Sequence, residues 1–260
     1  MAQKEIALVV ASKPPLHFSI DHAKLAKHTA SFSLPAGHTC PGADQCLTKR
    51  DLNTGRIVDG PKQTVRCFAA SMEVARPNLA RALDRNIKAL REAKTEDKMA
   101  DLIQQSLRHV AEVYSSIRIH VHGDFFSATY FRAWAKVATN NPQRLFYAYT
   151  KSLPIWIANF EAVPSNMLIV ASHGGKFDHM IKAYGLRSAR WVMHPEEAEE
   201  LRLPIDKDES LVVNPEIQHF ALLLHGTQPA GTEASLAIRR LRRENVSFTY
   251  SRLQKKNKKR

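Results

Sequence analysis

From Ile117 to Val121 every second residue is apolar, which predicts a β-strand with one apolar face. Arg118, His120 and His122 fall on the opposite face of this strand. A turn follows, and the spacing of large apolar residues predicts a helix from about Ala128. Charged and titratable groups therefore gather where a strand ends and a helix begins, which is where α/β proteins bind ligands.

Further strand-like runs follow at a regular spacing, and helical stretches fill most of the gaps between them. This alternation is typical of right-handed βαβ units and a mainly parallel sheet. Together with one or two earlier strands, the predicted strands suffice for an α/β fold built as a full or partial (β/α) barrel. An open doubly wound sheet is the alternative, although no Gly-x-Gly-x-x-Gly or Walker loop favours it. The predicted strands are Ile117 to His122, Leu145 to Thr150, Met167 to Ser172, Ala189 to His194, Phe220 to His225 and Val246 to Tyr250.

The first half of the chain gives a different pattern. A short apolar run, Ile6 to Ala11, predicts a first or edge strand. Apolar residues at helical spacing predict helices over Ala69 to Ala93, with an interruption at Pro77, and over Glu96 to Tyr114, with Thr95 as its cap. Such apolar stripes indicate core positions.

Between the first strand and these helices, residues 30 to 68 show little periodicity and many Gly and Pro residues. Long loops inside compact domains are usually functional. This predicted loop contains all three cysteines of the chain, Cys40, Cys46 and Cys67. We therefore expect a single domain over residues 1 to 250 with a cysteine-bearing loop at 30 to 68, and a basic, disordered tail at 251 to 260.

Composition narrows the class of protein. A hydrophobic content of 44% is enough for a substantial core, and no apolar run approaches the roughly 20 residues that a membrane span requires. The N-terminus lacks the features of a signal peptide, so we expect a cytoplasmic protein, in a host cytoplasm if it is phage-encoded, with no membrane partner. The net charge of +13 favours nucleic acid as a substrate or partner, with a role in solubility alone as the alternative.

The basic charge is concentrated at the C-terminal end. A predicted last helix and the tail carry positively charged residues that are candidates for non-specific contacts with nucleic-acid phosphates. These residues are Arg239, Arg240, Arg242, Arg243, Lys255, Lys256, Lys258, Lys259 and Arg260.

The odd number of cysteines in a chain without an export signal argues against a disulfide framework and favours a metal or free-thiol role. Five residues separate Cys40 from Cys46, and twenty separate Cys46 from Cys67. Three thiolates suit a [4Fe-4S] cluster with one substrate-accessible iron. A structural zinc is the alternative, with His38 as the nearest fourth ligand. Unligated thiols are the third possibility.

Several polar residues lie at the ends of the predicted strands, and a barrel would bring them to one mouth beside the cysteines. His122 and Asp124 are candidates for an acid/base or orienting pair, and Lys151 for holding a carboxylate or phosphate. No hydrolase motif is present. The further candidates for cofactor binding are Ser127, Tyr149, Ser152, His173 and His225.

Five segments resemble the phage "gene product 88" family: Ser31 to Ala43, Arg66 to Ser71, His122 to Ser127, Phe146 to Ser152 and Leu224 to Pro229. The resemblance extends from about Ser31 to Tyr250 and implies a protein of phages and mobile elements. The family has no established activity.

More distantly, the cysteine loop ahead of a βα series resembles radical S-adenosylmethionine enzymes and their barrel. That resemblance implies that the three cysteines ligate a [4Fe-4S] cluster whose open iron binds S-adenosylmethionine. It also implies that Asp124, Lys151 or His173 lies near the cofactor or substrate. The cysteine spacing departs from the usual Cys-x-x-x-Cys-x-x-Cys, which weakens the case for radical chemistry more than the case for cluster binding.

Three functions follow as hypotheses. The first is an enzyme that modifies nucleic acid or nucleotides by cluster-dependent chemistry. The second is a non-enzymatic nucleic-acid-binding protein whose cluster or zinc is structural. The third is a protein that interacts with a host protein. The sequence does not indicate the substrate or the oligomeric state.

Overall fold

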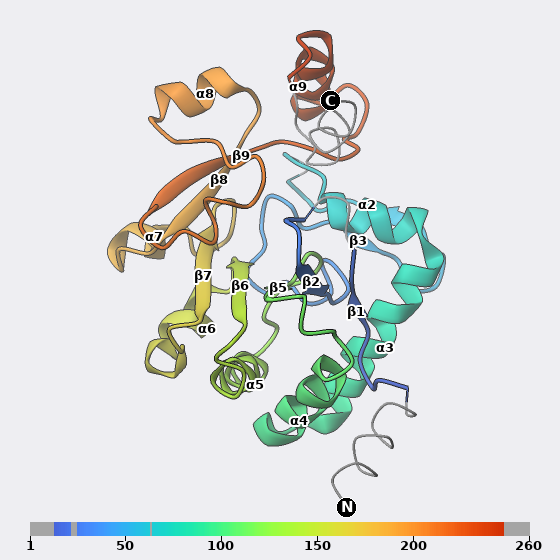
Figure 1. Ribbon diagram of the computed structural model, residues 1–260. Coiled ribbons are helices and arrows are strands. Elements are labelled where there is room, and N and C mark those ends of the chain that lie inside the picture. Colours follow the sequence, from blue (N-terminus) through green and yellow to red (C-terminus); the bar gives the residue numbers. More distant parts are fainter. Residues whose placement is uncertain (1–12, 22–24, 63, 247–260) are drawn as a thin grey trace, which may run out of the picture.

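The computed structural model describes residues 13–21, 25–62 and 64–246. Within them a seven-stranded sheet is surrounded by helices (Figure 1). The sheet strands are β1 (Phe18–Ser19), β2 (Thr29–Phe32), β5 (Ser116–Ile119), β6 (Leu145–Thr150), β7 (Met167–Ser172), β8 (Ser188–Val192) and β9 (His219–Leu223). A separate hairpin pairs β3 (Lys49–Arg50) with β4 (Ile57–Val58). The helices are α2 (Phe68–Ala75), α3 (Pro77–Ala93), α4 (Glu96–Leu107), α5 (Ala128–Thr139), α6 (Leu153–Ile157), η1 (Phe160–Ala162), α7 (His179–Ala183), α8 (Pro195–Glu200) and α9 (Glu233–Arg243).

The sheet order is β1-β2-β5-β6-β7-β8-β9, with β1 antiparallel to β2 and every other neighbouring pair parallel. The parallel strands follow the order of the chain without reversal. Because parallel crossovers are right-handed, such an order places the connecting helices on one side of the sheet. Figure 1 shows α3, α4, α5, α6 and α7 along the outside of the row of strands.

Both faces of the central strands are buried. One register row, Ile117, Phe146 and Met167, faces the outer helices and belongs to one buried cluster with Ile103 of α4 and Trp134 of α5. The inner face has its own cluster, which contains Tyr147, Val170 and Phe220 together with Val212 from the connection between β8 and β9. The continuous apolar runs of these strands are what burial on two faces requires.

The inner face also holds a buried ion pair. The carboxylate of Glu209, in the connection between β8 and β9, accepts a hydrogen bond from the Arg118 guanidinium and another, at 2.8 Å, from the hydroxyl of Tyr147. Buried charges are tolerated when they are paired and hydrogen-bonded. The segment between β8 and β9 is therefore fixed against the inside of the sheet.

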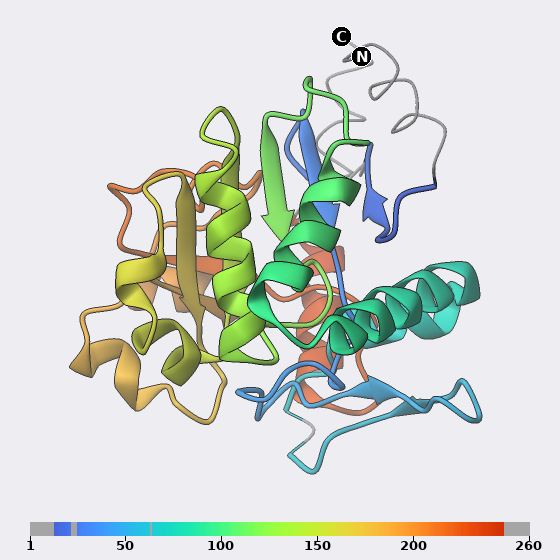
Figure 2. The ribbon, with the colours of Figure 1, turned by 90° about the horizontal axis from the view of Figure 1, so that it is seen from below.

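The mainly parallel α/β class predicted from the sequence is confirmed, and the closed barrel is not. In the part of the chain that the structure describes, β1 and β9 are the two edges of the sheet, and no pairing joins them. Seen from below, α5 and α4 lie in front of the strands (Figure 2). No helix within the described ranges is long and apolar enough to cross a membrane.

Individual predicted elements differ in outcome. β6 and β7 have the predicted bounds, the break before Pro77 separates α2 from α3, and Thr95 caps α4 by accepting a bond from the Lys98 N–H. The predicted loop over residues 30 to 68 was wrong in part, because β2 lies in its first residues and the β3–β4 hairpin in its second half. The helix from Glu96 was predicted too long and ends at Leu107. The N-terminal strand at 6–11, most of the strand at 246–250 and the tail at 251–260 lie outside the described residues.

Candidate functional site

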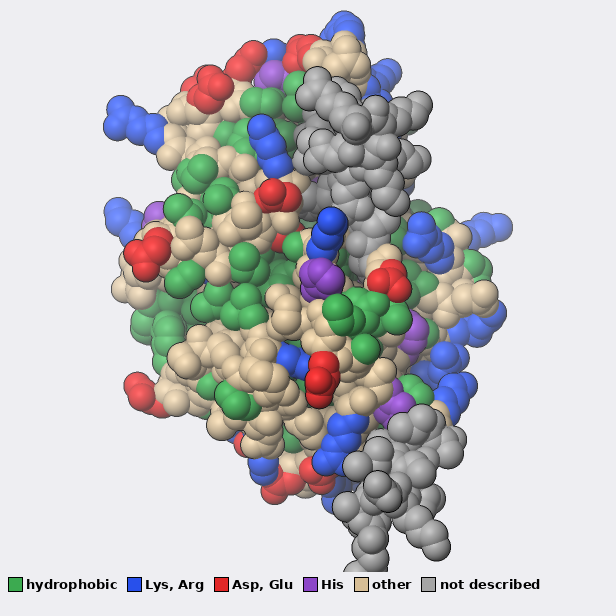
Figure 3. Space-filling view, viewed as in Figure 1, with side chains coloured by type: hydrophobic (Ala, Val, Ile, Leu, Met, Phe, Trp, Pro, Cys, Tyr) green, Lys and Arg blue, Asp and Glu red, His purple; other side chains and the backbone are tan. Residues whose placement is uncertain are grey.

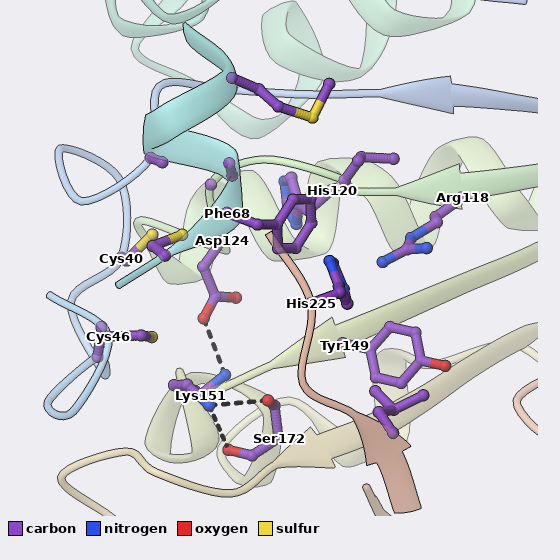
Figure 4. Close-up of a pocket in the computed structure, with 18 of the residues that line it drawn as sticks. Cys40, Cys46, Phe68, Arg118, His120, Asp124, Tyr149, Lys151, Ser172 and His225 are labelled. Atoms are coloured by element: carbon purple, nitrogen blue, oxygen red, sulfur yellow. Dashed lines mark hydrogen bonds between the residues drawn. The ribbon is translucent and has the colours of Figure 1, made fainter. Parts of the chain in front are cut away.

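A cavity of about 260 Å³ lies at the carboxyl ends of the parallel strands, and all three cysteines line it. Cys40 and Cys46 come from the connection between β2 and β3, and Cys67 directly precedes α2. Figure 4 shows Cys40 and Cys46 on one side of the cavity, Asp124 beside them, and Arg118, Tyr149 and His225 toward the other side. Residues that are widely separated in the sequence therefore meet around one space.

The segment with Cys40 and Cys46 is fixed to the ends of β6 and β7. A Cβ atom on Gly42 would overlap the carbonyl oxygen of Lys151, so the two backbones touch. The N–H of Lys176 donates to the Gly42 carbonyl at 2.9 Å, and the N–H of Gln45 donates to the Gly174 carbonyl at 3.1 Å. Only glycine permits so close an approach of two backbones.

The end of β5 holds the same segment from another side. Gly123 has a φ of +81°, and a Cβ atom there would lie 2.5 Å from the Thr39 hydroxyl and 2.8 Å from Leu34. The N–H of Leu34 donates to the His122 carbonyl at 3.0 Å. The glycine after His122 thus serves both the turn and the contact with the residues before Cys40.

Burial governs the ionisation of the thiols. It raises the pKa of Cys40 well above its usual value, and the nearby Asp124 and the Cys67 thiol raise this pKa further. Burial, followed by the Cys46 thiol, raises the pKa of Cys67 to about 12. At neutral pH these two residues are therefore thiols in the metal-free protein, and a metal that binds them must displace their protons.

Asp124 is a rigidly held carboxylate in the cavity wall. It accepts hydrogen bonds from the Thr150 hydroxyl at 2.6 Å, the Phe125 N–H at 2.7 Å and the Lys151 N–H at 2.8 Å (Figure 4). Burial raises its pKa, and these hydrogen bonds oppose that effect. The geometry favours a fixed negative or hydrogen-bonding group over a mobile base.

Lys151 lines the same wall. Its ammonium donates to the Ser172 hydroxyl at 2.8 Å, to the Ser172 carbonyl at 3.1 Å and to the His173 carbonyl. All three partners are neutral oxygens, and none of them is a carboxylate. The role predicted from the sequence for Lys151, holding a carboxylate or phosphate, stays a prediction.

The other predicted site residues divide into two groups. Tyr149 and His225 line the cavity with Asp124 and Lys151. His122, Ser127, Ser152 and His173 are not among the residues that line it.

His122 and Ser127 have evident structural partners. The Nδ1 atom of His122 lies 3.1 Å from Glu73 in a fully buried pair, and the Ser127 hydroxyl accepts a bond from the Tyr130 N–H and caps α5. His38, considered as a fourth zinc ligand, has its Nε2 atom 2.7 Å from the Arg50 carbonyl and does not line the cavity either.

Sequence reasoning did not select Phe68, Arg118 or Glu73. Phe68 and Arg118 line the cavity, and the Glu73 carboxylate joins three segments by accepting bonds from the Ala36 N–H and from His122. The strand alternation had already placed Arg118 on the face of the polar residues. It gave no indication of Glu73, whose role depends on contacts across 37 and 49 positions in the chain.

His120 is a buried histidine in the cavity lining that leads to a pH prediction. Its Nε2 atom lies 2.9 Å from the Tyr130 hydroxyl, and burial, followed by the charge of Arg118, lowers its pKa to about 3 from the 6.5 of an ordinary histidine. As the pH falls, His120 is therefore protonated in the unfolded chain before it is protonated in the folded protein. Its contribution to stability is complete above pH 6.5 and is lost as the pH falls toward 3. At pH 5 the expected loss is about 2 kcal/mol.

The measurement is the free energy of unfolding in urea at pH 7 and pH 5. In His120→Asn the difference between the two pH values should shrink by about 2 kcal/mol. As a control, replacement of the exposed His109 by asparagine should leave the difference between the two pH values unchanged. An equal acid sensitivity in His120→Asn and the wild type would show that His120 is not the group responsible.

The predicted phosphate-binding arginines of α9 are partly engaged elsewhere. Arg240 forms ion pairs at 2.8 Å with Glu196 of α8 and Glu244. Figure 3 shows acidic side chains over α8 beside the basic side chains near α9. Arg239 and Arg243 line a shallow surface depression with apolar Leu236. The charge around α9 is therefore mixed, and the basic residues predicted at 255–260 lie outside the described ranges.

In residues 13–21, 25–62 and 64–246, no three His, Cys, Asp or Glu side chains stand close enough together to hold a single metal ion. A four-iron cluster binds its thiolates on different iron atoms, so it accepts ligands that stand further apart than those of one ion. Three thiols around one cavity fit the donor set of such a cluster.

Comparisons with known proteins identify relatives of the chain. A sequence model of the family described as "Gene product 88" matches residues 10–255. The gene 88 protein of Mycobacterium phage L5 is 34% identical over 90 residues, which are 33% of this chain and 38% of that protein. The gene 88 protein of Mycobacterium phage D29 is 35% identical over 92 residues, with the same shares of the two chains. The alignments thus cover well under half of each relative, and no solved structure matches the chain.

Proposed function

We propose that this chain, which belongs to the Gene product 88 family of phage proteins, binds a [4Fe-4S] cluster in the cavity through Cys40, Cys46 and Cys67. The observation that carries the proposal is the meeting of the three cysteines in one cavity at the carboxyl ends of the parallel strands. Ligand sites of α/β proteins lie at this end of the sheet. The cavity also has a polar wall, as a site for a second molecule requires.

The donor set favours a cluster over a structural zinc. Zinc in structural sites takes four protein ligands, and His38, the fourth ligand considered, is bonded to a backbone carbonyl outside the cavity. Three thiolates leave one iron of a four-iron cluster free for a small molecule. When bound, such a cluster supplies one-electron transfer and an iron to which that molecule can coordinate.

The chain's own residues would orient the second molecule. Lys151 offers a positive charge for a carboxylate or phosphate, and Asp124 offers a fixed acceptor for a donor group. Tyr149 and His225 form further parts of the wall. S-adenosylmethionine is the proposed small molecule, and a nucleotide or nucleic acid is the proposed substrate. The net charge of +13 supports the choice of a polyanionic substrate.

The experiment is the analysis of iron, zinc and sulfide, with an absorption spectrum, on protein purified without oxygen. We expect about four irons and four sulfides per chain and a broad band near ~400 nm. One zinc per chain without iron would instead indicate a structural ion. Protein without iron and without sulfide after anaerobic reconstitution would refute the proposal.

A second candidate, a nucleic-acid-binding protein without cluster chemistry, is favoured by one observation. Arg81, Arg85, Lys88 and Arg91 are exposed at helical spacing along one side of α3, and Figure 3 shows basic side chains gathered at the right of the view, where α3 lies. A basic stripe suits a phosphate backbone. Metal-free protein whose affinity for DNA falls steeply with salt would favour this candidate over the first.

A further inference from the structure

Cys67 is held in part by its own helix, through hydrogen bonds from the backbone N–H groups of Ala69 and Ala70 to the sulfur. It precedes α2 as the N-cap residue. Its N–H donates to the Thr48 hydroxyl at 3.3 Å, which is a long hydrogen bond. The placement of this thiol therefore depends also on the segments that pack around residues 66 to 68.

One set of these contacts comes from the segment after β9, beside the ion pair that the Arg66 guanidinium forms with the Asp59 carboxylate. The side chain of Gln228 bonds both polar groups of the Arg66 backbone: its carbonyl oxygen accepts from the Arg66 N–H at 2.8 Å, and its amide donates to the Arg66 carbonyl at 3.1 Å. Because a backbone N–H only donates, the orientation of the Gln228 amide is unambiguous. A side chain 162 positions away thus pairs with the residue before Cys67 as a neighbouring strand would.

The same segment contacts the residue after Cys67. The ring of Phe68 lies 4.4 Å from that of His225, centroid to centroid. Gly226, with a φ of +88°, passes so close to Phe68 that a Cβ atom would lie 2.7 Å from the Phe68 Cβ. Residues on both sides of Cys67 are therefore contacted by three residues beyond β9, His225, Gly226 and Gln228.

We propose that Gln228 is a positioning residue that sets where the Cys67 thiol stands in the cavity. Gln228 is half-buried rather than part of the core. Its side chain acts through two hydrogen bonds to the Arg66 backbone, and its amide also donates to the His225 carbonyl at 3.4 Å. Of the measurements that test this inference, only the retention of iron rests on the proposed function. Outer partners of metal ligands are known to affect metal affinity strongly, which gives the contact a measurable consequence.

The test is Gln228→Glu. Glutamate keeps the size of the side chain and the acceptor for the Arg66 N–H, but it loses the donor and sets a negative charge against the Arg66 carbonyl. The matched control is Gln218→Glu, because Gln218 is exposed and its amide bonds the Pro215 carbonyl, far from the cysteines in sequence.

Two readouts need no metal. In the metal-free protein at elevated pH, Gln228→Glu should speed the alkylation of Cys67 but not of Cys40, which other segments hold. Amide hydrogen exchange should rise over residues 64 to 70. In the reconstituted protein, the cluster should be lost to a chelator about tenfold faster than in the wild type. The midpoint of thermal unfolding should change little, because the bonds lost are half-exposed.

The outcomes separate the two proposals. A wild type that holds no iron refutes the cluster, while the alkylation of Cys67 still decides the role of Gln228. If Gln228→Glu alters neither the alkylation nor the retention of iron, or affects Cys40 and Cys67 equally, Gln228 does not position Cys67 and the inference is overturned.

Discussion

Cys67→Ala should yield a folded protein that no longer retains iron or sulfide after gel filtration. Loss of an outer partner of a metal ligand already costs about 10- to 100-fold in metal affinity, so loss of a ligand should cost at least that much. The fold should survive, because the side chain lines an existing cavity and does not fill the core. We expect a loss of about 1 kcal/mol in the free energy of unfolding, from the missing packing of one sulfur atom.

The matched control for this variant is Ser71→Ala, which removes a single polar atom one turn later on the same helix. The Ser71 hydroxyl is buried and makes no hydrogen bond within the described residues, and Ser71 does not line the cavity, so iron and sulfide should stay at the wild-type level. Cys40→Ala and Cys46→Ala should behave as Cys67→Ala does. Full iron retention in any of the three cysteine variants would contradict the assignment of that residue as a ligand.

Gly42→Ala should both destabilise the protein and remove the cluster. The added Cβ would overlap the carbonyl oxygen of Lys151 and would lie 2.9 Å from the N–H nitrogen of Ser152, and both are backbone atoms that cannot turn aside. The segment between Cys40 and Cys46 must then leave the ends of β6 and β7. Overpacking of this kind costs about 3 kcal/mol or more. Urea unfolding and iron analysis measure the two effects.

Gly55→Ala is the control for Gly42→Ala. A Cβ atom on Gly55 meets nothing within 4 Å, and its φ of +68° makes alanine unfavourable by about 1 kcal/mol. This control separates a general cost of replacing glycine from the effect of the close approach at Gly42. Equal stability losses in the two variants, with iron retained in both, would show that the contact between Gly42 and Lys151 does not hold the cysteine segment.

The fold was predictable where a buried element is a continuous run of apolar residues in the sequence. β6 and β7 are buried on both faces, so each is a continuous apolar run with clear ends. β2 is equally buried, but its four residues, Thr-Ala-Ser-Phe, contain no apolar run, and it was predicted as loop. Closure of the sheet depends on pairing between its edge strands, and the local pattern of apolar and polar residues does not indicate such a long-range pairing.

β5 illustrates how backbone conformation limits a prediction from alternation. The pattern continues to His122, but His120 has a φ of +69°, outside the β region, so the strand ends at Ile119. The consequence is that His120 and His122 have different surroundings. His120 lines the cavity, whereas His122 is paired with Glu73.

The site was predictable to the extent that parallel strands bring their carboxyl ends together. Asp124, Lys151 and His225 follow such ends, Tyr149 is the penultimate residue of β6, and the structure places all four around the cavity with the cysteines. The positions of the cysteines themselves depend on long-range contacts, such as those of Gly42 with Lys151 and of Gln228 with Arg66. Spacing along the chain does not encode contacts of this kind.

The measurement that tests the central claim most directly is the Mössbauer spectrum of the protein reconstituted anaerobically with isotopically enriched iron. Three cysteine ligands on a four-iron cluster leave one iron in a different environment from the other three. We expect that single iron to have a spectrum of its own, which shifts when a small molecule coordinates it. Four irons with indistinguishable ligation, or no cluster spectrum at all, would contradict the claim that Cys40, Cys46 and Cys67 hold a cluster with an open position in this cavity.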